Sequence, residues 1–221
     1  FLSDRRVVEI PPLVWQPILR GIILNTRPKQ SAKAYAKVWT DKGSPLAFFT
    51  SAQTEALAER MGDAADVRYA MRYGNPSIGN QLAAMQQAGC NRILIAPLYP
   101  QYSGATTGTV HDEAYQVLSA MRWHPAIRTL PAYHDDPAYI GALKSSIEAS
   151  LAALDFTPDA IVISFHGMPE RTLHLGDPYH CHCQKTSRLL CEKLGWPADR
   201  WLTTFQSRFG NDPWLQPYTD K

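Results

Sequence analysis

The sequence predicts an α/β fold, because strand-like and helix-like patterns alternate over its second half. Two short runs, at residues 93–96 and 161–163, are apolar at every position, which is typical of strands covered on both faces of a parallel sheet. Between them, residues 140–154 carry apolar side chains at helical spacing. This alternation favours parallel strands joined by right-handed crossovers.

Five strands are predicted along the chain, after an N-terminal part made of helices and a loop. Before residue 50, several prolines and weak periodicity argue against sheet. The strands are expected at residues 67–73, 92–98, 127–131, 160–166 and 201–207. Ile78, Leu82 and Met85 predict a helix that ends at Gly89, a frequent helix stop.

A boundary between two structural units is expected near residues 133–137. His134, Asp135, Asp136 and Pro137 follow a predicted strand and form a helix-start signal. Three predicted strands precede this point and two follow it. If the chain is built from two similar halves, both are therefore incomplete.

Composition excludes several classes of protein. The net charge of +2 over 221 residues gives no electrostatic reason to bind nucleic acid. No apolar run approaches the roughly 20 residues needed to span a bilayer, although Leu13, Trp15, Ile18 and Ile22 beside Arg20 are compatible with peripheral membrane contact. Four cysteines indicate a reducing, cytoplasmic location rather than a disulfide framework. The chain opens without Met and is expected to be clipped, so it carries no information on a signal peptide. Nothing in the pattern indicates the oligomeric state.

The sharpest local motif is Ser-Phe-His-Gly-Met-Pro at residues 164–169. A strand runs directly into His166, and Gly167 and Pro169 then force a turn. The crevice beyond the carboxyl ends of parallel strands is where ligands bind in open α/β sheets. His166 is placed there as a base or metal ligand. The alternative, a histidine that only caps the strand and bonds a carbonyl group, fits the pattern equally well.

A second motif, residues 98–108, also follows a buried strand and leads into a helix. Its hydroxyl and amide groups suit an anion at a helix N-terminus. Tyr99 and Tyr102 instead suit a flat apolar ligand. The simpler interpretation is a helix cap formed by Thr106 or Thr107, which the spacing leaves open.

Two further strand ends carry functional side chains. Phe-Gln-Ser-Arg-Phe-Gly at residues 205–210 precedes Trp214, and Arg72 and Tyr73 precede a Gly-Asn-Pro turn. Arg72 is suited to holding a carboxylate, or each arginine is simply a solvated surface charge. Four strand ends with Arg, Tyr, His or Trp favour a common binding cleft.

Cysteine and histidine also cluster at residues 180–183, with His174 before them and Cys191 after. Structural zinc sites need two spaced pairs of ligands, and the Cys-x-Cys here has no clean second pair. A polar helix start, signalled by Asp177 and Pro178, is the favoured interpretation.

Taken together, these motifs resemble the ferrochelatases, which insert ferrous iron into porphyrins. The resemblance runs through nearly the whole chain and is most specific at residues 99–103, 164–167 and 205–210. It implies two Rossmann-like, chelatase-type domains with parallel sheets flanked by helices. Residues 1–133 would be an N-terminal half-domain without its first strand, and residues 134–221 the start of a second half-domain.

The resemblance also implies roles for individual residues. His166 matches the family's active-site histidine, which takes pyrrole protons or binds the entering metal. Tyr99, Arg72, Tyr73 and Trp214 match residues of the porphyrin pocket. Lys37 lies near a basic position associated with the porphyrin propionates, and Phe1 and Leu2 resemble an apolar lip over the macrocycle. Fe²⁺ is then a substrate, and protoporphyrin IX the partner that receives it.

The sequence departs from the family pattern at three places. It lacks the first strand with its glycine-containing loop, and it stops before the family's acidic metal-site residue. Gly104 stands where animal enzymes carry a cysteine for a two-iron two-sulfur cluster, so such a cluster is not expected. As given, the chain is expected to be weakly active or inactive. The competing hypotheses are a cobalt, sirohaem or coproporphyrin chelatase and, outside enzymes, a two-domain binding module.

Overall fold

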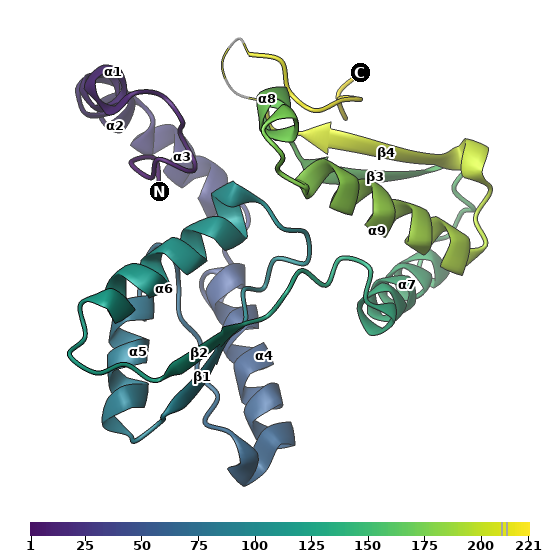
Figure 1. The fold of residues 1–221 in the computed structure, drawn as a ribbon. Helices are drawn as coiled ribbons and strands as arrows, with labels where there is room; N and C mark the ends of the chain where they lie inside the picture. The colour runs from purple at the N-terminus through teal and green to yellow at the C-terminus, as the bar shows by residue number, and fades with distance from the viewer. Residues whose placement is uncertain (209, 211) are drawn as a thin grey trace. The chain divides into compact units, whose positions relative to one another are not determined.

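The computed structural model describes residues 1–208, 210 and 212–221. These residues form two compact units, one made of Phe1–Ile95 with Gly108–Arg128 and the other of Ala96–Thr107 with Thr129–Lys221. Each unit is organised on a two-stranded sheet and its helices (Figure 1). The α/β fold class is confirmed, while the half-domain limits 1–133 and 134–221 stay a prediction.

Helices occupy the start of the first unit, as the prolines predict. They are α1 (Pro12–Ile18), the π-helical turn η1 (Leu19–Ile23), α2 (Leu24–Thr26), α3 (Pro28–Ala36), α4 (Pro45–Met61) and the short turn η2 (Gly62–Ala64). Prolines stand in the first turn of α1, α3 and α4, where the missing N–H costs nothing. This placement explains why a proline-rich segment is helical.

The sheet of the first unit pairs β1 (Arg92–Ile95) with β2 (Ala126–Thr129). Helices α5 (Ile78–Gln87) and α6 (Thr109–Ser119) pack against each other beside it. The buried core there consists of Ile78, Leu82, Ile93, Ala114 and Leu118. Leu94, on the opposite face of β1, is 60% exposed. In the described residues, the apolar run is thus covered on one face and not on both.

Two strand predictions in this region are wrong, and one open alternative, the threonine cap, is not adopted. Residues 67–73 form no strand and make only a bridge between Met71 and Ser77, because a ladder needs a neighbouring strand as well as a suitable pattern. The strand expected at 92–98 ends at Ile95, before Pro97, which has no N–H to donate. Thr106 and Thr107 do not cap α6, because the chain enters that helix through a π-helical turn, η3 (Gly104–Gly108).

The second unit follows the predicted strand–helix order closely. It contains α7 (Pro137–Ala152), β3 (Ile161–His166), α8 (Glu170–His174), α9 (Tyr179–Leu194), the turn η4 (Ala198–Arg200) and β4 (Trp201–Gln206). Asp136 caps α7 by accepting the N–H groups of Ala138 and Tyr139. The helix-start signal read from the sequence is therefore confirmed.

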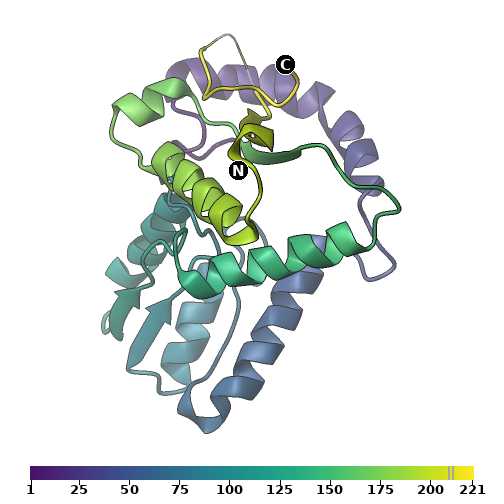
Figure 2. The ribbon, with the colours of Figure 1, turned by 90° about the vertical axis from the view of Figure 1, so that its right-hand side faces the viewer.

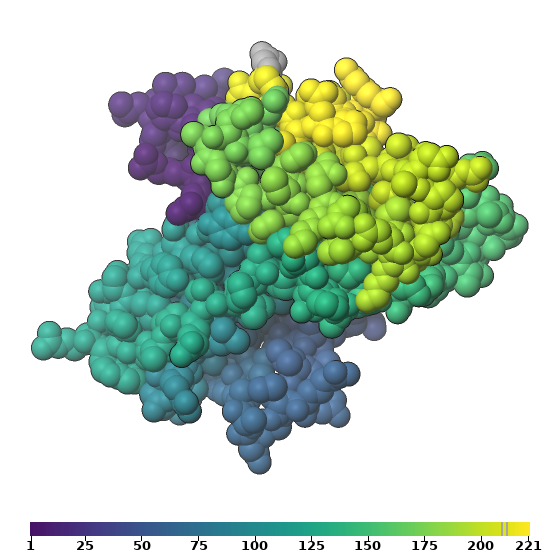
Figure 3. All heavy atoms as spheres, turned by 45° about the vertical axis from the view of Figure 1, so that its right-hand side comes forward, coloured from purple at the N-terminus to yellow at the C-terminus, as the bar shows by residue number. Residues whose placement is uncertain are grey.

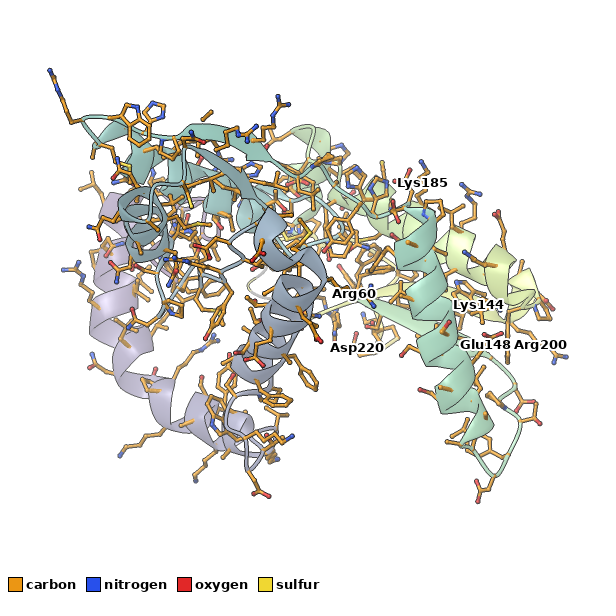
Figure 4. All side chains as sticks on the ribbon, turned by 90° about the horizontal axis from the view of Figure 1, so that it is seen from below. Arg60, Lys144, Glu148, Lys185, Arg200 and Asp220 are labelled. Atoms are coloured by element: carbon orange, nitrogen blue, oxygen red, sulfur yellow. The ribbon has the colours of Figure 1, made fainter. Side chains whose placement is uncertain are left out.

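Strands β3 and β4 pair in parallel, with Ile161 opposite Trp201 and His166 opposite Gln206. Helices α7 and α9 pack together beside this sheet (Figure 2). On the outer surface of α7, Lys144 and Glu148 form an ion pair one helical turn apart, at 2.8 Å (Figure 4). Val162 and Leu202 are each half exposed, so this sheet too has one open face in the described residues.

A C-terminal segment adds to the carboxyl end of β3. The N–H of Leu215 donates to the carbonyl of Met168, and that of Glu170 to the carbonyl of Pro213, both at 2.9 Å. Leu215 joins Cys183 and Phe205 in a buried cluster. This pairing seats the chain after β4 directly against the turn after His166.

Gly167 is required by this close approach. A Cβ atom there would lie 2.7 Å from the backbone oxygen of Gln206 and 3.3 Å from the Trp214 ring. Gly167→Ala is therefore expected to lower the free energy of unfolding by about 1–3 kcal/mol, as overpacking does, when measured by urea titration followed by tryptophan fluorescence.

Gly141→Ala is the matched control. Its Cβ would meet only the flexible end of Lys193, at 3.4 Å, inside helix α7. It should leave stability unchanged or raise it by up to about 1 kcal/mol, because alanine favours helix. Equal losses in the two variants would show that the close approach at Gly167 is not tight.

Candidate active site

His166 ends β3 with its side chain exposed. Its Nδ1 atom lies 2.7 Å from the carbonyl oxygen of Gly167. That oxygen can only accept, so Nδ1 donates and the lone pair of the neutral ring lies on Nε2. A bond to a carbonyl group was the alternative that fitted the sequence of this residue equally well. The same bond fixes the tautomer that a base or metal ligand needs.

Trp214 is brought to the same place by the C-terminal segment. It forms an antiparallel bridge with Pro169, and its ring lies against the Cα side of Gly167. The histidine and the aromatic residue predicted for the site are thus neighbours, separated by one glycine. Both depend on the turn that follows β3.

The loop that carries Tyr99 belongs to the same unit as His166. Tyr99 is 42% exposed, whereas Ser103 is fully buried and anchors the end of the loop. Side chains at the start of α9 hold the loop through four hydrogen bonds: Gln101 Nε2 to Thr186 Oγ1 (3.0 Å), Tyr102 N–H to His182 Nδ1 (3.1 Å), Ser103 Oγ to Asp177 Oδ2 (3.1 Å) and Gly104 N–H to Asp177 Oδ2 (2.7 Å). The loop is therefore fixed at every residue from 101 to 104.

The same end of α9 also reaches His166. The hydroxyl of Tyr179 donates to the His166 carbonyl at 3.0 Å. Burial raises the pKa of Tyr179, which keeps this donor protonated. Sequence reasoning missed Asp177, Tyr179 and His182 as site residues. The available signal was helical spacing, since residues 179, 182, 183 and 186 lie on one helix face.

Arg72 and Tyr73 meet in the first unit around a carboxylate that the sequence did not suggest. Asp4 accepts hydrogen bonds from Arg72 and from the Tyr73 hydroxyl, both at 2.7 Å. The Phe1 ring lies edge-on to Tyr73, with centroids 5.2 Å apart. The carbonyl of Leu2 accepts from the Trp15 indole at 2.7 Å. The structure thus brings together Arg72, Tyr73 and Phe1, with Leu2 next to Phe1 in the chain.

Hydrogen bonds and ion pairs connect Asp4, Arg72 and Tyr73 and shift the pKa values of Asp4 and Tyr73. Burial raises the pKa of Tyr73 to about 12, and its bond to Asp4 adds to the rise. Burial also acts to raise the pKa of Asp4, but hydrogen bonds from Tyr73, the Arg6 backbone and Arg72 hold it below its ordinary value. Arg72 makes a second ion pair with Glu113 at 3.1 Å. Arg72 therefore forms ion pairs with two carboxylates of the protein, those of Asp4 and Glu113.

Lys37 lies apart from this group. It follows the last turn of α3 and is exposed, with its N–H bonded to the carbonyl of Ala34. Within the described residues, no recorded contact joins it to Arg72, Tyr73, Phe1 or Leu2. Its role at the propionates stays a prediction.

The remaining strand-end motif is only partly described, because Phe209 lies outside the described residues. Ser207, directly after β4, has a left-handed backbone with φ of 68°. Arg208 pairs with Asp220 and lies over the Tyr218 ring, 4.1 Å from its centroid. Arg208 thus holds the C-terminal segment instead of being simply a solvated charge.

The cysteines of α9 do not face a common point. Cys181 is exposed, whereas Cys183 and Cys191 are buried. Burial raises the pKa of Cys183 to about 12, so with no metal bound its sulfur is a neutral thiol at pH 7. Cys191 donates to the Trp196 carbonyl at 3.4 Å. In the described part of the chain, no three His, Cys, Asp or Glu side chains gather as metal ligands.

Comparison with known proteins gives a consistent result. The family model described as Ferrochelatase matches residues 1–221. The chain is 56% identical to the ferrochelatase of Rhizobium meliloti (strain 1021), with 100% of this chain and 66% of that protein covered. It is 55% identical to the ferrochelatase of Allorhizobium ampelinum and 51% identical to that of Agrobacterium fabrum, each covered over 65% of its length.

The chain spans just under two thirds of the length of these relatives. These relatives are all named ferrochelatase. They do not favour the alternatives of another chelatase or a binding module. With a family match over every residue, the chain belongs to the ferrochelatase family.

Proposed function

We propose that this chain carries the part of a ferrochelatase that inserts Fe²⁺ into protoporphyrin IX to form protohaem. The observation that carries the proposal is His166, which ends β3 with Nδ1 committed to a carbonyl and its lone pair on Nε2. The full-length family match and relatives of more than 50% identity named ferrochelatase support the assignment.

The chemistry requires a proton acceptor. A porphyrin loses two pyrrole protons when iron enters, and the iron stays ferrous throughout. Neutral His166 takes one proton at Nε2 and passes it to water or carboxylates, and the ring restored to its neutral form then takes the second proton in the same way. Imidazole and oxygen groups are also suitable ligands for incoming Fe²⁺. His166 Nε2 can therefore bind the metal first and accept a pyrrole proton after the metal has passed to the porphyrin.

The remaining predicted residues would bind the macrocycle. Tyr99 and Trp214 offer aromatic surface in the unit that contains His166. Arg72, Tyr73 and Phe1 form a second group around Asp4, and Leu2 and Lys37 are carried over from the family resemblance. Contacts of this kind can supply the energy that bends a porphyrin and exposes its pyrrole lone pairs.

In the full-length protein, His166→Ala should lower the rate of iron insertion at least about 100-fold, as expected for loss of a general base. Porphyrin binding, measured by fluorescence quenching, should change little, because the aromatic and basic groups remain. Insertion is followed by the disappearance of free porphyrin fluorescence.

His174→Ala is the control for that variant. His174 is an exposed histidine on α8 whose recorded ion pair is with Glu170, at 3.7 Å. It should insert iron at the parental rate. A His166→Ala protein that kept near-parental turnover would remove His166 from the mechanism.

We also propose that the cytoplasmic protein touches the inner membrane peripherally through its N-terminal helices. No helix in the described residues is long and apolar enough to cross a membrane. However, Leu13 is 93% exposed, and Ile22 and Leu24 are each more than half exposed. The N-terminal segment lies at the surface in Figure 3. Arg20, on the adjoining turn, suits anionic headgroups.

Leu13→Asp should weaken binding to vesicles of mixed neutral and anionic phospholipid by about tenfold or more, because burying one leucine is worth roughly 1.5–3 kcal/mol. Co-sedimentation of the full-length protein with the vesicles measures this. Leu175→Asp is the control, since Leu175 is also 77% exposed but lies in the other unit. Equal effects of the two substitutions would contradict the proposed contact.

A further inference from the structure

Two histidines outside the proposed catalytic group stack against each other in the second unit. The rings of His134 and His182 have centroids 3.6 Å apart and planes only 8° apart. His134 precedes α7, and His182 lies on the second turn of α9. One turn further along α9, the Thr186 hydroxyl donates to the His134 carbonyl at 2.7 Å and accepts from Gln101. The stacked pair and the Tyr99 loop therefore share one helix face.

The bond from the loop to His182 fixes the protonation state of that ring. A backbone N–H can only donate, so the Tyr102 amide requires a lone pair on His182 Nδ1. In the neutral ring the proton is then on Nε2. Protonation of Nδ1 would set two N–H groups against each other at 3.1 Å and break the bond.

The surroundings favour the neutral form of both rings. Burial lowers the pKa of His182. The nearby His134 and Lys185 lower it further, while Asp135 and Asp177 oppose the shift. Burial also lowers the pKa of His134, with Lys185 acting in the same direction and Asp135 against it. Lys185, labelled in Figure 4, is itself paired with Asp135. His134 Nδ1 is buried with no hydrogen-bond partner in the described residues, and it lies 3.9 Å from the Asp135 carboxylate that opposes the shift.

We propose that His182 is a positioning residue that holds the Tyr99-bearing loop in place only while its Nδ1 atom carries no proton, with His134 stacked on it to keep the ring oriented. The link to porphyrin binding rests on the proposed function, through Tyr99. The anchoring of the loop does not rest on it, because every contact involved lies within one unit.

The direction of the pH dependence follows from the lowered pKa values. A histidine whose pKa is lower in the fold than in the unfolded chain stabilises the fold fully above the unfolded value of about 6.5. That contribution is lost as the pH falls through 6.5 toward the folded pKa. The loop should thus be held at pH 7.5 and released on acidification.

Two substitutions separate the acceptor from the ring. His182→Asn offers an amide oxygen close to the position of Nδ1, so it keeps the acceptor without a titrating group. His182→Phe keeps a flat ring to stack on His134 but has no acceptor. Each variant keeps one of the two contacts of His182, since Asn retains the acceptor for the Tyr102 amide and Phe retains the stack on His134.

The direct test is hydrogen exchange of the Tyr102 amide in the full-length protein, measured by NMR at pH 7.5 and 5.5 and corrected for intrinsic exchange. The parent should lose protection about tenfold at the lower pH, which corresponds to about 1.4 kcal/mol. His182→Asn should be equally protected at both values, and His182→Phe weakly protected at both. Parental protection in His182→Phe, or a parent without pH dependence, would overturn the proposal.

Kinetics then test the link to the porphyrin. At pH 7.5, His182→Phe should raise the KM for protoporphyrin several-fold with kcat within about twofold, and His182→Asn should restore the parental KM. If KM does not respond although amide protection changes as expected, Tyr99 is not a porphyrin contact, and that part of the proposed function fails while the anchoring stands. If the parent protein shows the expected protection of the Tyr102 amide but inserts no iron, the proposed function is overturned and the anchoring role of His182 stands.

Discussion

Asp177 is the residue on which the arrangement of the second unit depends. Its carboxylate accepts the Ser103 hydroxyl, the Gly104 N–H and the Tyr179 N–H, so one side chain ties a distant loop to the start of α9. A negative charge just before a helix of 16 residues is also favoured by the helix dipole, by about 0.3–1 kcal/mol. Bonds to an ionised acceptor are stronger than neutral ones, which suits this anchoring role.

From this anchor the site is built outward in two directions. Through Gln101 and Tyr102, the helix fixes the loop that carries Tyr99. Through the Tyr179 hydroxyl it reaches the carbonyl of His166. Gly167 then allows the Trp214 segment to close against the strand end. His166, Trp214, the loop that carries Tyr99 and helix α9 are thus parts of one connected set of hydrogen bonds and packing contacts.

Features that depend on a few neighbouring residues could be predicted from the sequence, whereas contacts between distant residues could not. The ends of β3 and β4 and the start of α7 were predicted because apolar runs and the Asp-Pro cap act within a few residues. The strand expected at 67–73 failed because pairing depends on a partner that the pattern does not contain. His166 was expected at a strand end and lies there, whereas Trp214 lies eight residues beyond the end of β4. Asp4, which meets Arg72 from 68 positions away, had no local signal at all.

The parallel pairing of β3 with β4 has a consequence for biosynthesis. Ile161 pairs with Trp201, 40 positions later in the chain, and helices α8 and α9 lie between. As the polypeptide leaves the ribosome, the β-prone segment Ile-Val-Ile-Ser-Phe therefore waits without its partner while those helices are translated, a delay of several seconds at about 5–20 residues per second. During that interval its unpaired backbone groups and apolar side chains form the kind of segment that associates with other nascent chains. A chaperone bound at this stage would protect the strand that ends at His166.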